Sequence, residues 1–201
     1  AMRSADVLRH EADVAIQLVR PSALDVKAVR LGRLHVMWYA SQSYIELYGK
    51  PSTYEELAKH RIVMQFSDQT GADEAVQEWF PGMRHEDLLV MRTNVSSANY
   101  WAIAKGAGIG LLPTYGSAIG ARVEPLDIDG MHRPFDIWLS YHPDAGRIPR
   151  VRKMIDCIVE SFSAAHFPWF SDTFIHPNEL STLYKGKPLV NMFEGFSAAA
   201  G

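Results

Sequence analysis

Residues 94–113 read NVSSANYWAIAKGAGIGLLP, and this stretch predicts a helix followed directly by a strand. We expect the helix over residues 97–105, because Gly106 is placed to end it. Residues 108–113 then return as an apolar strand that ends at Pro113. A helix that leads straight into a buried strand is typical of folds in which helices cover a sheet.

The same alternation of strands and helices extends in both directions from this stretch. Ser41 or Ser43 is placed to cap a short helix that Gly49 ends, and Ser52 with Glu55 forms a candidate capping box for the next helix. The pattern predicts an α/β fold with mixed or parallel strands. We expect strands at 13–19, 24–31, 34–40, 62–66, 88–93, 108–113, 123–126 and 135–141, and helices at 4–12, 41–47, 52–60, 76–80, 97–105, 115–119 and 150–162.

Two of these elements carry apolar residues that predict how they are buried. Both faces of the strand at 13–19 are apolar, which is typical of a strand covered on both sides. The helix at 150–162 has one apolar stripe, and we expect the single cysteine, Cys157, to lie in the core beside it. The stripe consists of Val151, Met154, Ile155, Ile158 and Phe162.

The composition favours a folded, globular protein. The chain has 201 residues, of which 47% are hydrophobic and 21% charged, and a net charge of −3. This balance argues against nucleic-acid binding by this piece, which normally needs a concentrated basic face. One cysteine allows no internal disulfide and fits a reducing cytoplasm. No apolar run approaches the ~20 residues of a membrane span, and the first residues lack the apolar core of a signal peptide.

Several segments, taken in order, resemble the effector-binding domain of LysR-type transcriptional regulators. Residues 8–16 read LRHEADVAI, and residues 39–61 contain YAS, YI, GKP, EL and HR at the expected spacing. Residues 94–113 follow, and then a strand that ends at 141–143 and a helix with Val151-Arg152 and Ile155-Asp156. The resemblance covers about residues 6–163, and it rests on the joint order of these signatures.

The resemblance implies two α/β lobes joined by two crossover strands, as in type II periplasmic binding proteins. The first lobe would comprise residues 1–38 plus 142–166, the second lobe 39–141, and residues 167–201 would be a C-terminal extension. The family's winged helix-turn-helix is not found in the sequence, nor is the first strand, helix and strand of the sensing domain. We therefore expect an incomplete first lobe, with the extension as a candidate to fill the gap.

The candidate effector site is the start of the helix in the opening stretch. A helix N-terminus offers unpaired N–H groups and a partial positive charge to an anion, and Asn94, Ser96 and Ser97 add neutral donors. The alternative is that one of these three residues simply caps the helix. Ser41 begins another helix and is a weaker candidate on the same reasoning. Phe66, Pro113 and Thr114 are candidates to line the cleft, although aromatic and strand-end residues are more often ordinary packing residues.

Other chemistries are less well supported by the sequence. The glycines in Gly106-Ala107-Gly108-Ile109-Gly110 follow a helix and enter a strand, which reverses the order of a dinucleotide-binding fingerprint. No two histidines are three or four residues apart, and no catalytic set is visible, so we expect no metal, no cofactor and no enzyme activity.

The resemblance then implies a cytoplasmic, effector-sensing domain that binds a small anionic molecule and no membrane. It also implies a homo-oligomer, with DNA contacted only through the winged-helix domain of the intact protein. The alternatives are a solute-binding protein of a transporter with the same fold and, with less support, an enzyme on this fold.

Overall fold

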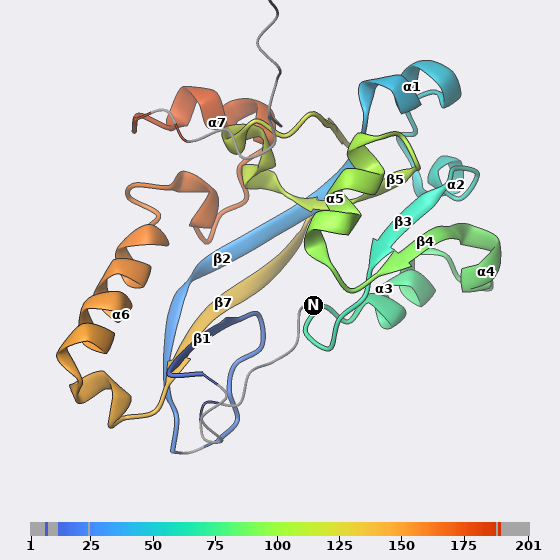
Figure 1. The fold of residues 1–201 in the computed structure, drawn as a ribbon. Helices are drawn as coiled ribbons and strands as arrows, with labels where there is room; N and C mark the ends of the chain where they lie inside the picture. The colour runs from blue at the N-terminus through green and yellow to red at the C-terminus, as the bar shows by residue number, and fades with distance from the viewer. Residues whose placement is uncertain (1–6, 8–11, 24, 188, 190–201) are drawn as a thin grey trace, which may run out of the picture.

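Two long strands, β2 (Lys27–Ala40) and β7 (Arg133–Tyr141), run antiparallel through the middle of a single sheet (Figure 1). The computed structural model describes residues 7, 12–23, 25–187 and 189. Among these residues the sheet has the order β1-β7-β2-β5-β3-β4, and β6 pairs with β2 beside this path. Strands and helices alternate along the chain, as the sequence predicts.

The sheet is antiparallel at one end and parallel at the other. β1 (Val14–Gln17) pairs antiparallel with β7, and β5 (Ile109–Pro113) pairs antiparallel with β2. β3 (Ile62–Gln65) lies parallel to both β5 and β4 (Leu89–Thr93). The last residues of β2 also pair with β6 (Glu124–Leu126). β2 therefore pairs with three strands: β7, β5 and β6.

Helices cover both faces of this sheet (Figure 1). Along β2, Trp38 packs into one core cluster and its neighbour Tyr39 into another, because successive side chains of a strand point to opposite faces. The α-helices are α1 (Gln42–Tyr48), α2 (Tyr54–Leu57), α3 (Ala72–Trp79), α4 (His85–Leu88), α5 (Ser96–Ala104), α6 (Pro149–Ser161) and α7 (Pro177–Leu183), and the 3₁₀ helices are η2 (Thr114–Ile119), η3 (Ala145–Arg147) and η4 (Pro168–Phe170).

The glycines of the opening stretch allow close packing around β5. A Cβ on Gly110 would lie 2.6 Å from the Ile103 Cδ1 of α5 and 2.6 Å from the Val63 carbonyl of β3. A Cβ on Gly108 would lie 2.4 Å from the Arg61 carbonyl. Real side chains do not tolerate such distances, so these two positions require glycine for space.

The other end of the sheet is less covered than the sequence predicts. α6 packs with Val151 and Ile155 against Leu139 of β7, whereas Met154 is 56% exposed and Cys157 is also exposed. The prediction of a core cysteine is therefore wrong, because the buried face of α6 is narrower than its apolar stripe. The prediction that β1 is covered on both sides is also wrong, since its Ile16 is 47% exposed.

The C-terminal extension packs against the body of the domain. η4 contacts β2, and α7 contacts η2. Gly32 makes this possible, because a Cβ there would lie 2.8 Å from the Phe170 carbonyl, at the point where the β2–β7 register shifts. Arg30 binds the carboxylates of both Asp136 and Asp172, which joins the two long strands to the extension.

Several boundaries differ from the predictions. The strands expected at 24–31 and 34–40 are one strand, β2, because a bulge between Arg30 and Gly32 lets the pairing with β7 continue. The capping box is shifted by one residue: Thr53 caps α2, and the Glu56 carboxylate accepts from the Ser52 N–H. The helix expected at 76–80 begins four residues earlier, since α3 spans Ala72–Trp79. The predicted helix at 4–12 lies largely outside the described residues.

The substitution Gly110→Ala should destabilise the domain by about 1–3 kcal/mol, because the added methyl group overpacks the contact between α5, β5 and β3. Urea unfolding followed by circular dichroism measures the change. Gly116→Ala is the matched control, since a Cβ there meets only the Ala121 Cβ, at 3.4 Å. Equal unfolding midpoints for the two variants would contradict the packing argument.

Buried His35 should make stability depend on pH. Its Nε2 donates to the Ser171 carbonyl at 3.0 Å, and its buried Nδ1 has no partner. Burial lowers the pKa of His35 below its value in the unfolded chain, so the unfolded state binds more protons between these two pKa values. The free energy of unfolding should therefore fall as the pH drops from 7.5 to 5.5, and His35→Gln should fall less. An unchanged pH dependence in the variant would exclude His35 as a cause.

Candidate functional site

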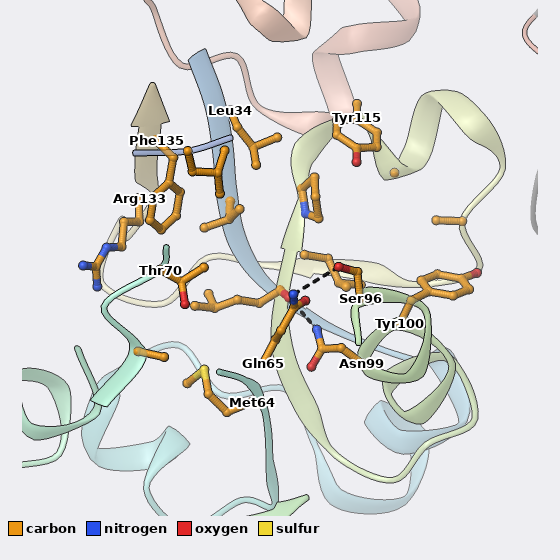
Figure 2. Close-up of a pocket in the computed structure, with 18 of the residues that line it drawn as sticks. Leu34, Met64, Gln65, Thr70, Ser96, Asn99, Tyr100, Tyr115, Arg133 and Phe135 are labelled. Carbon is orange, nitrogen blue, oxygen red and sulfur yellow. Dashed lines mark hydrogen bonds between the residues drawn. The ribbon is translucent and has the colours of Figure 1, made fainter. Parts of the chain in front are cut away.

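A cavity of about 410 Å³ lies beside the start of α5, where β2, β5 and β7 approach one another (Figure 2). Most of its wall is apolar, and α3 and η2 contribute further side chains. The residues that line it are Leu18, Leu34, Val36, Met64, Gln65, Thr70, Ala72, Ala75, Trp79, Ser96, Ser97, Asn99, Tyr100, Leu111, Leu112, Pro113, Tyr115, Gly116, Ile119, Ala121, Val123, Arg133 and Phe135.

Three of the seven predicted site residues meet in this wall. Ser96 and Ser97 begin α5, and Pro113 ends the strand that follows it, so the opening stretch supplies both sides of one corner of the cavity. This arrangement follows from the close packing of α5 on β5. Whether these residues bind an effector stays a prediction.

The other four predicted residues lie outside the cavity lining. Ser41 is the N-cap of α1, where its hydroxyl accepts from the Tyr44 N–H at 3.2 Å. The Phe66 ring lies against the Arg92 guanidinium, 4.0 Å from the ring centre. Asn94 is exposed, and Thr114 is 1% exposed within η2. Each has a position that ordinary packing or capping explains.

The start of α5 is not capped by the residues that the sequence singles out. Val95 is the N-cap and makes no side-chain bond to the helix. The interpretation of Asn94, Ser96 or Ser97 as the cap is therefore wrong. The Ser96 hydroxyl instead accepts from the Gln65 Nε2 at 3.0 Å, across to β3 (Figure 2). The first N–H groups of a helix have no partner within it, so this end can serve an anion.

Two further polar residues of the wall were not predicted from the sequence. Asn99 lies one turn after Ser96 and is 2% exposed, with its Nδ2 donating to the Leu111 carbonyl at 3.1 Å. The Tyr100 hydroxyl oxygen accepts a hydrogen bond from the Arg122 N–H at 3.1 Å. Helical spacing places residues 96, 99 and 100 on one face of α5. Once Ser96 was a candidate, this spacing could have predicted Asn99 and Tyr100 as wall residues.

Arg133 is the charged residue among the described residues of the wall. Its guanidinium lies 5.7 Å from the ring centre of Trp79 and 5.5 Å from that of Phe135, at one side of the cavity (Figure 2). Burial raises the pKa of Tyr115, so this phenol is neutral at neutral pH. The site therefore combines apolar walls, neutral donors and one cation. Nothing in the sequence pattern marked Arg133, because it comes from a distant strand.

In the described part of the chain, no group of three or more His, Cys, Asp or Glu side chains could hold a metal ion. No helix within residues 12–187 is both long and apolar enough to cross a membrane.

The crossing strands, the mixed sheet and the polar corner of an apolar cavity define the class of α/β ligand-binding domains. A family model described as the LysR substrate binding domain matches residues 2–163. The chain belongs to this family, whose members are the regulatory domains of transcriptional regulators. No curated protein matches the chain.

Solved structures with the same fold include three regulators. The regulatory domain of CrgA from Neisseria meningitidis is 18% identical, with a TM-score of 0.64 and 78% of each chain covered. The CcmR regulatory domain of Synechocystis PCC6803, in complex with 2-PG, is 18% identical with a TM-score of 0.55, covering 78% of this chain and 76% of that one. Full-length LysG from Corynebacterium glutamicum, with bound effector Arg, is 17% identical with a TM-score of 0.58, and the match covers 78% of this chain and 53% of that one.

These findings confirm the expected fold class, a type II periplasmic-binding-protein-like α/β fold. The family match ends at residue 163, before η4 and α7. No residue of 164–187 lines the cavity, so the extension packs on the domain without supplying this wall.

The substitution Ser41→Ala should lower the free energy of unfolding by about 1 kcal/mol, because it removes the hydroxyl that accepts from the Tyr44 N–H. Chemical denaturation measures the loss. Ser41→Asp is the control, since aspartate also caps helices and should retain most of the stability. If Ser41→Ala is as stable as the parent chain, the cap does not contribute.

Proposed function

We propose that this chain is the effector-sensing domain of a LysR-type transcriptional regulator and that it binds a small anionic molecule in the cavity beside α5. One observation carries the proposal: Ser96 and Ser97, at the start of a nine-residue helix, line an apolar cavity that also contains Arg133. The helix end and the guanidinium both favour negative charge, and the apolar wall excludes the water that would screen it.

The long strands suggest how binding could be transmitted. In this proposal the first lobe comprises residues 1–38 plus 142–166 and the second lobe 39–141, and the cavity draws on both, because Leu18 and Leu34 face it together with α5. A ligand that contacts both lobes biases their closure by the difference in its affinity for the two conformations. In the intact regulator, this bias would change how paired subunits hold DNA through a winged-helix domain.

Two neighbours in structure support a small, charged effector. The CcmR regulatory domain is described in complex with 2-PG, and LysG with bound effector Arg. Their sequence identity to this chain is 18% and 17%, so they support effector binding by this fold and not the identity of the ligand here.

The family match also bears on the two alternative functions, a solute-binding protein of a transporter and an enzyme. A solute-binding protein of a transporter is not favoured, because the match is to the regulatory domain of transcription factors. We propose that the domain binds its ligand without transforming it, acts within the cytoplasm and assembles as a homo-oligomer. Size-exclusion chromatography with light scattering tests the last of these points directly.

A thermal melt against small carboxylates, amino acids, aromatic acids and phosphates tests the proposal. A ligand at about one hundred times its dissociation constant should stabilise the folded state by ~2.7 kcal/mol, which raises the melting temperature. The double variant Ser96→Ala, Ser97→Ala should lose most of this shift, because it removes both hydroxyls at the helix start.

Ser181→Ala is the matched control, since Ser181 is an exposed serine of α7 that does not line the cavity. It should keep the full shift. A selective shift that survives in the double variant would place the ligand elsewhere. No shift with any compound, in a chain that melts cooperatively, would count against effector binding by this domain.

A further inference from the structure

The end of α1, the segment that leads into α2 and the start of β3 (Figure 1) line a second cavity, of about 440 Å³. All of its lining residues lie within residues 44–61, and none of them lines the cavity beside α5. Three of them are Lys or Arg, whereas Arg133 is the one cation in the described wall of the first cavity. The two cavities are therefore separate and differ in charge.

A buried hydrogen-bond network holds one side of this second cavity in place. Tyr44 is 2% exposed, and its hydroxyl oxygen accepts from the Arg61 backbone N–H at 3.1 Å. The hydroxyl proton then donates to the Nδ1 of His60, 3.2 Å away. Burial lowers the pKa of His60, so the ring is neutral at neutral pH and carries its proton on Nε2. The network joins α1 to the start of β3 and places the three side chains in the wall.

The positive charges of this wall come from Lys50, Lys59 and Arg61, and all three residues are exposed. The Arg61 guanidinium lies 5.3 Å from the ring centre of Tyr48, which also lines the cavity. Within the described part of the chain, none of the three cations forms a salt bridge. Their charged ends are thus accessible to an anion that enters from solvent.

Glu56 is the acidic residue of the wall, and its carboxylate is held by the start of α2. Its Oε2 accepts from the Ser52 N–H at 2.8 Å and from the Ser52 hydroxyl at 3.0 Å. These bonds lower the pKa of Glu56, so it stays ionised at neutral pH. Three positive charges and one negative charge leave the wall with a net charge of +2, on a chain whose net charge is −3. This local excess attracts anions.

The charge and the donors of the wall select among anions. Lys and Arg only donate hydrogen bonds, and both are common partners of phosphate oxygens. A phosphate monoester carries close to two negative charges above its second pKa of ~6, which matches the net charge of the wall. A carboxylate or a phosphodiester carries one charge and leaves the excess partly unbalanced. The cavity is also larger than a phosphate group, which leaves space for the ester body.

We propose that this cavity is a second ligand site, which binds small phosphate monoesters as dianions. Lys50, Lys59 and Arg61 contact the phosphate oxygens, while Tyr44 and His60 hold the backbone of Arg61 in position. The inference goes beyond the proposed function, because it assigns a separate site and does not depend on ligand binding beside α5.

An NMR titration of the backbone amides tests this assignment with methyl phosphate, a monoester, and dimethyl phosphate, a diester. Both are small, and at about pH 7.5 they differ in charge by nearly one unit. At constant ionic strength, methyl phosphate should shift amides within residues 49–61 in a saturable manner. Dimethyl phosphate should bind about tenfold more weakly, because it has half the charge.

The double variant Lys59→Gln, Arg61→Gln should bind methyl phosphate at least about tenfold more weakly, since it removes two of the three cations. The matched control is Arg152→Gln, Lys153→Gln, which removes the same charge from exposed positions of α6 that line neither cavity. The control should bind within about twofold of the parent chain, because general attraction by net charge changes equally in both variants.

Four results would overturn the site: no saturable shift with methyl phosphate, equal affinities for the two phosphates, unchanged affinity in the double variant, or an equal loss in the control. Shifts at residues 96 and 97 in place of residues 49–61 would put the phosphate beside α5 and would also overturn it. If the double variant does not fold by circular dichroism, Lys50→Gln, Lys59→Gln provides the same comparison.

Discussion

The close contact between α5 and β5 is the constraint on which the site depends. Gly110 leaves room for the fully buried Ile103 of α5 above the strand and for the Val63 carbonyl of β3 beside it. A side chain at this position would separate the helix from the sheet. The helix would then no longer hold Ser96 against Gln65 or Asn99 against the Leu111 carbonyl. Gly110 therefore fixes the polar corner of the cavity, although the residues that follow it in β5 and not Gly110 itself line the wall.

The second organising feature is the length of β2. Its residues 27–36 pair with β7 and its residues 36–40 pair with β5 and β6. One continuous strand therefore connects the antiparallel part of the sheet to the part that contains β5, β3 and β4. The bulge near Gly32 interrupts the register without ending the strand, and it is also where the Phe170 carbonyl approaches. His35 lies a few residues along and bonds the Ser171 carbonyl. The extension is thereby attached to the strand that connects both parts of the domain.

The sequence predicted the elements better than their limits, and local signals explain the difference. The cap and the glycine end of α1 are local signals, because each acts on backbone within a few residues. Gly49 was predicted correctly, and of the two serines that the sequence offered as the cap, Ser41 is the one that caps the helix. The continuity of β2 depends on pairing with β7, about one hundred residues away, so the sequence pattern suggested two strands. Cys157 looked apolar enough for the core, but its burial depends on whether another element covers that side of α6.

The site shows the same division between local and distant information. Ser96, Ser97 and Pro113 belong to one helix–strand unit, and their spacing alone brings them to one corner. Arg133 and Phe135 come from β7, and Leu18 follows β1, so only the tertiary fold places them in the same wall. Ser41 and Phe66 have residue types suited to a cleft, yet capping of α1 and packing on Arg92 account for them. Residue type without position could not separate these cases.

A binding cavity of this kind requires a compromise between stability and recognition. Apolar lining residues such as Leu34 and Val36 favour any apolar body of suitable size, because the hydrophobic effect is not directional. Discrimination must therefore come from the few polar atoms, whose hydrogen bonds have defined geometry. The hydroxyls of Ser96 and Ser97 and the guanidinium of Arg133 are such polar groups in this wall. The apolar majority of the wall therefore favours binding without discrimination, and selectivity depends on the few polar groups beside it.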